Sequence, residues 1–221
     1  MMKAYRTLLI LFMILLPVTV ISLGANLTAR MPDVYQYDFK STNGLSGLGL
    51  GKDDDEMGKF ISDYMFGKSE EFQIDVGEEK SDFVFNEREM AAVRTARMYL
   101  NVLAAVGVVA MVISVAAVLV AKKKDGDKEL RNYFKKGVVL YVLLTVVYVG
   151  VFFAVMSMGH SPGALVGYLP MEEDVLPLIF TKELLAKVCL TSVVVCSVIY
   201  VLLGYLLYKL TEPKKIFSRT Y

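Results

Sequence analysis

The single histidine of the chain, His160, is the side chain best suited to move a proton near neutral pH. It stands three residues after the end of an apolar stretch (137–157) and directly before Ser161-Pro-Gly163. As a general base, His160 could deprotonate an amine or a hydroxyl group of a substrate beside it. The alternative, which the local sequence favours, is an interfacial histidine that ends a helix.

Glu89, Arg88 and Arg97 form a second group of charged candidates, close together in the sequence. Asn86 stands three residues before Glu89, which predicts a capping box at the start of a helix. Glu89 could also be a buried hydrogen-bond acceptor. Arg88 and Arg97 could bind a phosphate or a carbonyl oxygen, although arginines near an apolar helix commonly extend toward the interface.

The sequence contains no motif typical of a metal site, a cofactor site or a nucleic-acid-binding surface. It has one histidine and two cysteines, Cys189 and Cys196, with no CxxC pair and no ligand cluster. The basic segment 122–136 has no accompanying aromatic platform of the kind that binds nucleic acid. We therefore predict no cofactor, no metal and no nucleic-acid partner, and two free cysteines.

Four stretches without charged residues must position these candidates. They cover roughly 7–24, 99–121, 137–157 and 186–208, with Lys187 at one edge, and consist mainly of Leu, Val, Ile, Ala and Phe. About 20 apolar residues in a helix span a bilayer core of about 30 Å. The sequence therefore predicts a four-span membrane protein, and no span has a charge near its middle, which disfavours a transporter.

The distribution of charge between these spans predicts their orientation. Segment 122–136 has seven Lys or Arg against three acids, whereas 25–98 has nine against fifteen. Because positive residues collect on the cytoplasmic side, we expect both termini and segment 122–136 in the cytoplasm. The first stretch could alternatively be a signal peptide cleaved near Gly24. We prefer an anchor, since the apolar core is long.

The long segment between the first two spans is expected to fold outside the membrane. Asp53–Phe66 has the apolar spacing of an amphipathic helix, with Gly67 as its C-cap. Alternation in Met31–Phe39 predicts an extended segment, and alternation in 72–76 and 83–85 predicts a hairpin. We therefore expect a small mixed α/β insertion.

The order of these parts resembles the bacterial membrane family of lipoprotein intramolecular transacylases over nearly the whole chain. The most similar run is Val84-Phe-Asn-Glu-Arg-Glu-Met90 leading to Arg97, and Tyr35-x-Tyr37 and Tyr64-Met-x-Gly67 also look like family positions. The resemblance implies transfer of an acyl chain from the diacylglyceryl group of a lipoprotein to the amine of its N-terminal cysteine. Two histidines are understood to be central to the reaction in that family.

This chain departs from the family pattern at its chemical centre. Alignment on Glu89 and Arg97 places Ala92 at the first histidine and Thr95 at a signature aspartate. His160 matches the second histidine, although Ser161-Pro-Gly-Ala164 replaces an aromatic run. The resemblance implies His160 as the base, Glu89 as its orienting partner, and Arg88 or Arg97 as contacts to the acyl ester.

Two functional hypotheses follow, both for a multi-pass protein of the bacterial plasma membrane in contact with membrane lipids. The first is an acyltransferase, or a diverged relative of one, acting on membrane lipoproteins; the second is a non-enzymatic protein whose outer domain binds an envelope component or a partner protein. The fold class is an all-α membrane protein of four transmembrane helices with a small mixed α/β extracytoplasmic insertion between helices 1 and 2. The expected segments are 1–24 (signal anchor and first span), 25–86 (insertion), 87–121 (outer helix and second span), 122–136 (basic cytoplasmic loop), 137–157 (third span), 158–185 (second outer loop), 186–208 (fourth span) and 209–221 (cytoplasmic tail).

Overall fold

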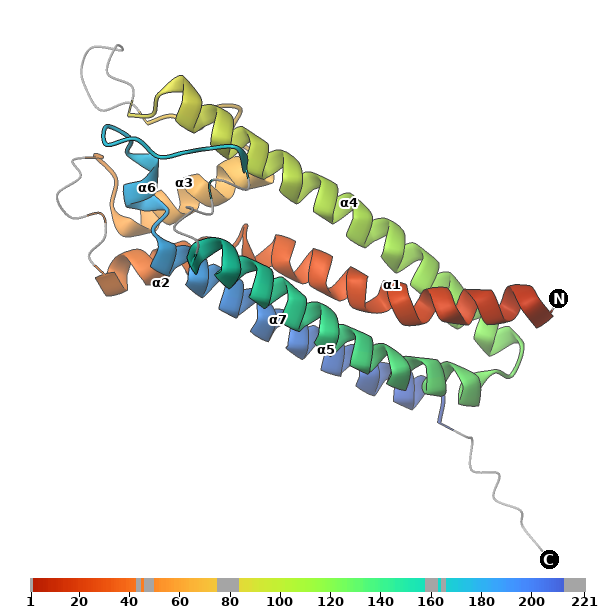
Figure 1. Ribbon diagram of the computed structural model, residues 1–221. Helices are drawn as coiled ribbons and strands as arrows, with labels where there is room; N and C mark the ends of the chain where they lie inside the picture. The colour runs from red at the N-terminus through yellow and green to blue at the C-terminus, as the bar shows by residue number, and fades with distance from the viewer. Residues whose placement is uncertain are drawn as a thin grey trace, which may run out of the picture.

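The computed structural model describes residues 2–42, 45, 50–74, 84–157, 163 and 166–212, which form helices and connecting segments. Four long helices run beside one another, and three short helices gather at one end, which we call the insertion end (Figure 1). In chain order the helices are α1 (Met2–Thr28), α2 (Pro32–Thr42), α3 (Asp54–Phe66), α4 (Glu87–Lys123), α5 (Asp127–Ser157), α6 (Leu176–Ile179) and α7 (Lys182–Leu210).

The four long helices α1, α4, α5 and α7 have the length and composition of membrane spans. Their outward faces are apolar and uncovered by the rest of the protein; Val139 on α5 and Val201 on α7 are 62% and 69% exposed. Such a surface is compatible with lipid, because an α-helix satisfies its own backbone hydrogen bonds. Each of the four predicted spans is therefore present as a helix long and apolar enough to cross a membrane.

The predicted mixed α/β insertion is wrong, because the described part of residues 25–86 has no strand. Residues of the predicted extended segment form α2 instead. In a helix, Tyr35 and Phe39 lie one turn apart and share the buried face, while Tyr37 points away and is 71% exposed. The spacing of four residues between Tyr35 and Phe39 fits one face of a helix as well as it fits one face of an extended segment. Residues 75–83, which include most of the predicted hairpin, lie outside the described residues.

Capping residues next to α3 in the sequence determine where this helix starts and ends. Asp53 is its N-cap and accepts a hydrogen bond from the Glu56 N–H at 2.7 Å. Gly67 follows its last turn with a φ of 85°, a left-handed conformation that glycine adopts without strain. The predicted amphipathic helix is confirmed.

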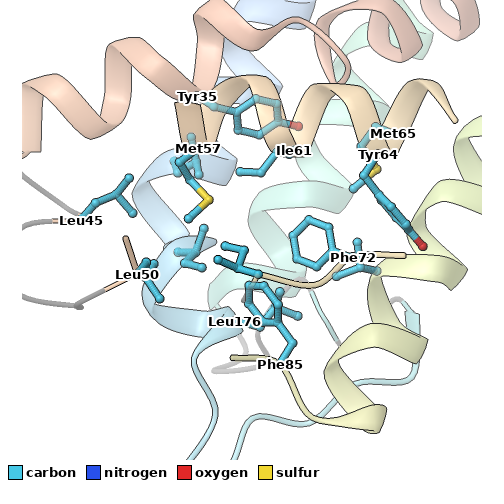
Figure 2. Packing of buried hydrophobic residues seen from close by; sticks show 14 of the residues in the cluster. Tyr35, Leu45, Leu50, Met57, Ile61, Tyr64, Met65, Phe72, Phe85 and Leu176 are labelled. Carbon is cyan, nitrogen blue, oxygen red and sulfur yellow. The ribbon is translucent and has the colours of Figure 1, made fainter. Parts of the chain in front are cut away.

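The core of the insertion end is aromatic and includes parts of the chain far apart in sequence. Phe72 lies at its centre, with ring centroids 4.8 Å from those of Phe60 and Phe85 and 5.2 Å from that of Tyr64 (Figure 2). Residues of α2, α4, α6 and α7 complete the cluster. This packing fixes the small helices against the ends of α4 and α7.

Within the bundle, α1 is the central helix and packs against α4, α5 and α7. Small residues of α4, spaced three and four apart, lie buried: Gly107, Ala110, Ser114, Ala117 and Ala121. Small residues let two membrane helices approach closely. At Gly107 a Cβ would lie 2.7 Å from the Leu23 side chain of α1, so this contact depends on glycine.

Candidate functional site

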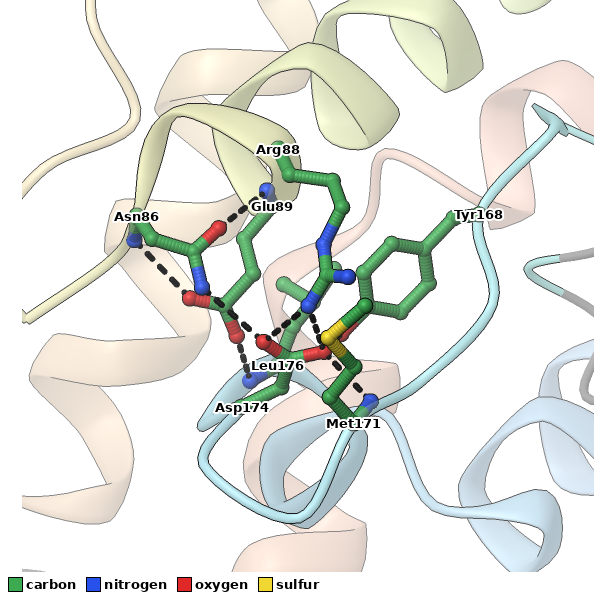
Figure 3. Close-up of polar contacts among 7 residues, drawn as sticks. All are labelled: Asn86, Arg88, Glu89, Tyr168, Met171, Asp174 and Leu176. Carbon is green, nitrogen blue, oxygen red and sulfur yellow. Dashed lines mark hydrogen bonds and ion pairs between the residues drawn. The ribbon is translucent and has the colours of Figure 1, made fainter.

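Glu89 lies 1% exposed at the start of α4, where the predicted capping box is present. The Glu89 N–H donates to the Asn86 side chain at 2.9 Å, and the Asn86 N–H donates to Glu89 Oε2 at 2.9 Å. The other carboxylate oxygen, Oε1, accepts the Leu176 N–H at 2.6 Å (Figure 3). Glu89 therefore joins α4 to α6, with both oxygens hydrogen-bonded.

Asp174 is the second buried carboxylate of this cluster, at 4% exposure. The Arg88 Nη2 donates to both of its oxygens, at 2.7 and 2.8 Å, and the Asn86 side-chain amide donates at 2.9 Å. Tyr168 OH and the Met171 N–H add donors at 2.8 and 2.7 Å. Figure 3 shows these groups converging on one carboxylate from both sides.

The protonation states of this cluster are fixed by the same contacts. Burial alone raises the pKa of Asp174, but the hydrogen bonds from Met171, Tyr168, Asn86 and Arg88 outweigh it and lower the pKa to about 2. Burial and the hydrogen bond to Asp174 raise the pKa of Tyr168. Near neutral pH, Asp174 is thus an anion and Tyr168 a neutral donor, an arrangement that holds chain segments together.

An apolar cavity of about 440 Å³ lies beside this cluster. Residues from α2, α3, α4, α6 and α7 line it, and its α4 wall consists of Ala92, Val93, Ala96, Tyr99, Leu100 and Leu103. Two tyrosine hydroxyls at the wall are already engaged, Tyr35 with the Ala29 carbonyl at 2.6 Å and Tyr168 with Asp174. Over the described residues, the wall has no carboxylate, imidazole or amine.

A second apolar cavity, of about 540 Å³, lies deeper in the bundle. It too lies between α4 and α7, and α1 contributes a third wall with Phe12, Leu16 and Val20. Both cavities therefore lie between the same two helices, one at the insertion end and one in the half nearer the loop that joins α4 to α5.

The structure brings together two of the four candidate site residues. Arg88 and Glu89 belong to one cluster, linked through Asn86, which contacts both Glu89 and Asp174. Arg97 is elsewhere, with Nη1 donating to the Ser69 carbonyl at 3.1 Å and its guanidinium 4.9 Å from the centre of the Tyr64 ring. His160 lies outside the described residues.

Sequence reasoning missed Asp174 and Tyr168. Asp174 ends the acidic run Glu172–Asp174, which is typical of a solvated loop, and its two acidic neighbours are indeed exposed. The one local signal was its position directly before the apolar residues 175–180. Nothing in the local pattern indicated that Arg88, 86 residues earlier, would be its partner.

The comparisons with known proteins add one finding about the fold. No protein-family model matches the sequence, and no curated protein gives a significant match. A solved structure of the membrane integral lipoprotein intramolecular transacylase Lit from Bacillus cereus, a histidine-to-alanine variant, is similar with a TM-score of 0.68 and 12% identity. The match covers 95% of this chain and 94% of that one. This chain therefore has a Lit-like fold.

Proposed function

We propose that this protein binds the lipid-modified end of a membrane lipoprotein, with an acyl chain in the apolar cavity at the insertion end. The observation that carries the proposal is the cavity itself, about 440 Å³ and lined by apolar side chains of α4 and α7. This volume is within the range of small-molecule pockets. The Lit-like fold supports a lipoprotein as the source of the acyl chain.

The charge distribution supports an extracytoplasmic insertion end. Lys122, Lys123 and Lys124 end α4 at the opposite end of the bundle, and the positive-inside rule assigns that end to the cytoplasm. In a bacterial plasma membrane the cavity then faces the outer leaflet. Lipoproteins are anchored there by their acyl chains.

The charged groups next to the cavity favour binding over catalysis. Glu89 and Asp174 each accept hydrogen bonds at both oxygens, so neither is a free base. Ala92, which the family resemblance aligns with a histidine, lines the cavity with a methyl group. We therefore give priority to a non-enzymatic lipoprotein-binding role.

Filling the cavity tests this role. Ala92→Phe places a ring inside the cavity, whereas Ala91→Phe places the same ring on the exposed face of α4 one residue away. The probe is a synthetic diacylglyceryl lipopeptide with a photoreactive group in one acyl chain, added to the full-length protein in nanodiscs. We expect the crosslinking yield to fall about tenfold in Ala92→Phe, as for loss of about 1.4 kcal/mol of binding free energy, and to stay unchanged in Ala91→Phe. Equal yields in both variants would refute the proposed cavity.

Transacylation is the second candidate, favoured by the Lit-like fold. In this hypothesis His160 accepts a proton from the cysteine amine as nitrogen attacks the ester carbonyl. An amide bond forms, the ester C–O bond breaks, and the proton goes to the released glycerol oxygen. Glu89 would orient His160, and Arg88 or Arg97 would contact the ester.

Mass spectrometry of lipoprotein N-termini separates the two candidates. The protein and its His160→Ala variant are expressed in a host that lacks other transacylases. Lipoprotein binding without catalysis leaves the diacylglyceryl form in both strains. A lyso form that requires His160 would establish the transacylase and contradict the non-enzymatic proposal.

A further inference from the structure

Two arginines lie together where α1 ends, apart from the cluster around Asp174. The Arg30 Nη2 donates to the Asn101 Oδ1 at 2.7 Å, and Arg97 is one turn before Asn101 on α4. Residues four apart on a helix are neighbours on its surface. Arg30 and Arg97 therefore present their guanidinium groups to the same region between α1 and α4.

The last turn of α3 holds both guanidinium groups in place. Arg30 lies 5.6 Å from the centre of the Phe66 ring, and Arg97 lies 4.9 Å from that of Tyr64. A Cβ at Gly67 would stand 2.7 Å from the Nη2 of Arg97, so the glycine lets the guanidinium lie against the backbone. Ring contacts of this kind restrict the two side chains and leave N–H groups on their outer sides.

The positive charge of this pair is not compensated within the described part of the chain. None of the ion pairs among those residues includes Arg30 or Arg97, whereas Arg88 pairs with Asp174. The Arg30 Nε is buried and has no hydrogen-bond partner among the described groups. Burial, and next the charge of Arg97, lower the pKa of Arg30. Two adjacent cations with free donors favour an anion.

The exposed surface of α4 next to this pair indicates which kind of anion the pair binds. Met98, Tyr99 and Val102, within about one turn of Arg97 and Asn101, are more than half exposed and begin the apolar outer face of α4. The guanidinium pair thus lies at the level where a membrane changes from acyl chains to headgroups. A guanidinium fork matches the oxygens of a phosphate.

We propose that Arg30 and Arg97 bind the phosphate of a phospholipid whose acyl chains lie along the exposed apolar face of α4. The site differs from the proposed lipoprotein cavity in its ligand, because a diacylglyceryl group has no phosphate, and Tyr99 lies at the border between the two. Asn101 positions Arg30, and Ser69 positions Arg97.

Native mass spectrometry of the full-length protein tests this site. The protein is released from mixed micelles that contain equal amounts of phosphatidylglycerol and of diacylglycerol with the same acyl chains. We expect about tenfold more phosphatidylglycerol than diacylglycerol to stay bound, and we expect the double variant Arg30→Gln/Arg97→Gln to remove this preference. Arg94→Gln is the matched control, since Arg94 is an exposed arginine on the same helix.

Three results would overturn the proposal: an unchanged preference in a folded double variant, an equal loss in Arg94→Gln, or displacement of the lipid by inorganic phosphate, which would assign a soluble ligand. If the double variant does not fold, the wild-type protein provides a second measurement. Its preference for phosphatidylglycerol should weaken as ionic strength rises from about 50 mM to about 500 mM, because salt screens partly exposed charges. A preference independent of salt would also contradict a site made of two arginines.

Discussion

At the scale of single residues, Asp174 connects separate segments of the chain at the insertion end. One buried carboxylate receives donors from Asn86 and Arg88 at the start of α4, and from Tyr168 and Met171 in the segment before α6. The local sequence predicted the capping box between Asn86 and Glu89, because both partners lie within one turn. It could not predict the hydrogen bond from the Leu176 N–H to Glu89, 87 residues away, because that contact depends on how α6 packs.

Asp174 gives the insertion end an acid-sensitive stability. Its pKa is about 2 in the folded protein against an ordinary value of 3.8, so the unfolded chain binds the proton more tightly. The stabilisation is therefore complete above about pH 5 and is lost as the pH falls from about 4 toward 2. Thermal unfolding followed by circular dichroism in detergent should show a lower midpoint over this range.

The variant Asp174→Asn isolates this effect. It removes the charge that Arg88 faces and weakens the buried hydrogen bonds, so it should lower the free energy of unfolding by about 1 to 3 kcal/mol at neutral pH, with a flatter acid response. Glu173→Gln, which changes an exposed acid next to it, should leave both unchanged. If Asp174→Asn had the same free energy of unfolding as the wild type, the cluster around Asp174 would not stabilise the fold.

At the scale of elements, the sequence predicted those helices whose signals are local. The helix Asp54–Phe66 has a capping aspartate, a continuous apolar face and a terminal glycine, and all three agree. The segment that forms α2 was misassigned because three aromatic residues at alternate positions also fit a helix with one exposed ring. Packing in the core of the insertion end stabilises the helix over the extended segment, because Tyr35 packs edge-on against Phe180 there.

Two glycines in the membrane helices should respond oppositely to the same change. A Cβ at Gly107 would lie 2.7 Å from the Leu23 side chain, whereas a Cβ at Gly150 would meet nothing within 4 Å. Gly107→Ala should destabilise by about 1 to 3 kcal/mol because Leu23 must move. Gly150→Ala should be neutral or stabilising by up to about 1 kcal/mol, because alanine favours the helix.

A thiol-reactive fluorophore can measure both variants, since Cys189 and Cys196 are free and buried and react on unfolding. The unfolding temperature should fall for Gly107→Ala and should not fall for Gly150→Ala. A fall of the same size in both would mean that the close contact between α1 and α4 is not what makes Gly107 sensitive.

At the scale of the whole molecule, four apolar stretches were sufficient to predict four spans, because span length follows from bilayer thickness. The same stretches could not predict which helix is central. All four are apolar on most sides, so their pairing depends on small residues such as Gly24, Gly107 and Gly137, each close to a neighbouring helix. A single sequence shows these glycines but does not show what they face.

The proposed orientation can be tested on intact cells. A membrane-impermeant maleimide should label Glu173→Cys at the insertion end and should not label Lys123→Cys at the opposite end. The native Cys189 and Cys196 are buried and give little background. The reverse labelling pattern would place the insertion end in the cytoplasm and contradict the proposed lipoprotein partner.

The central place of α1 has a consequence for biogenesis. It leaves the ribosome before its partners α4, α5 and α7, and the earliest of these, α4, begins at Glu87, 59 residues after Thr28. In the folded protein its polar residues Thr19, Ser22, Asn26 and Thr28 are buried. Until α4 arrives, the Asn26 amide lacks the Leu100 carbonyl to which it donates in the finished protein. During synthesis of the insertion, the nascent chain therefore holds an unpaired Asn26 amide near the membrane, and we expect an insertase to shield this amide until α4 arrives.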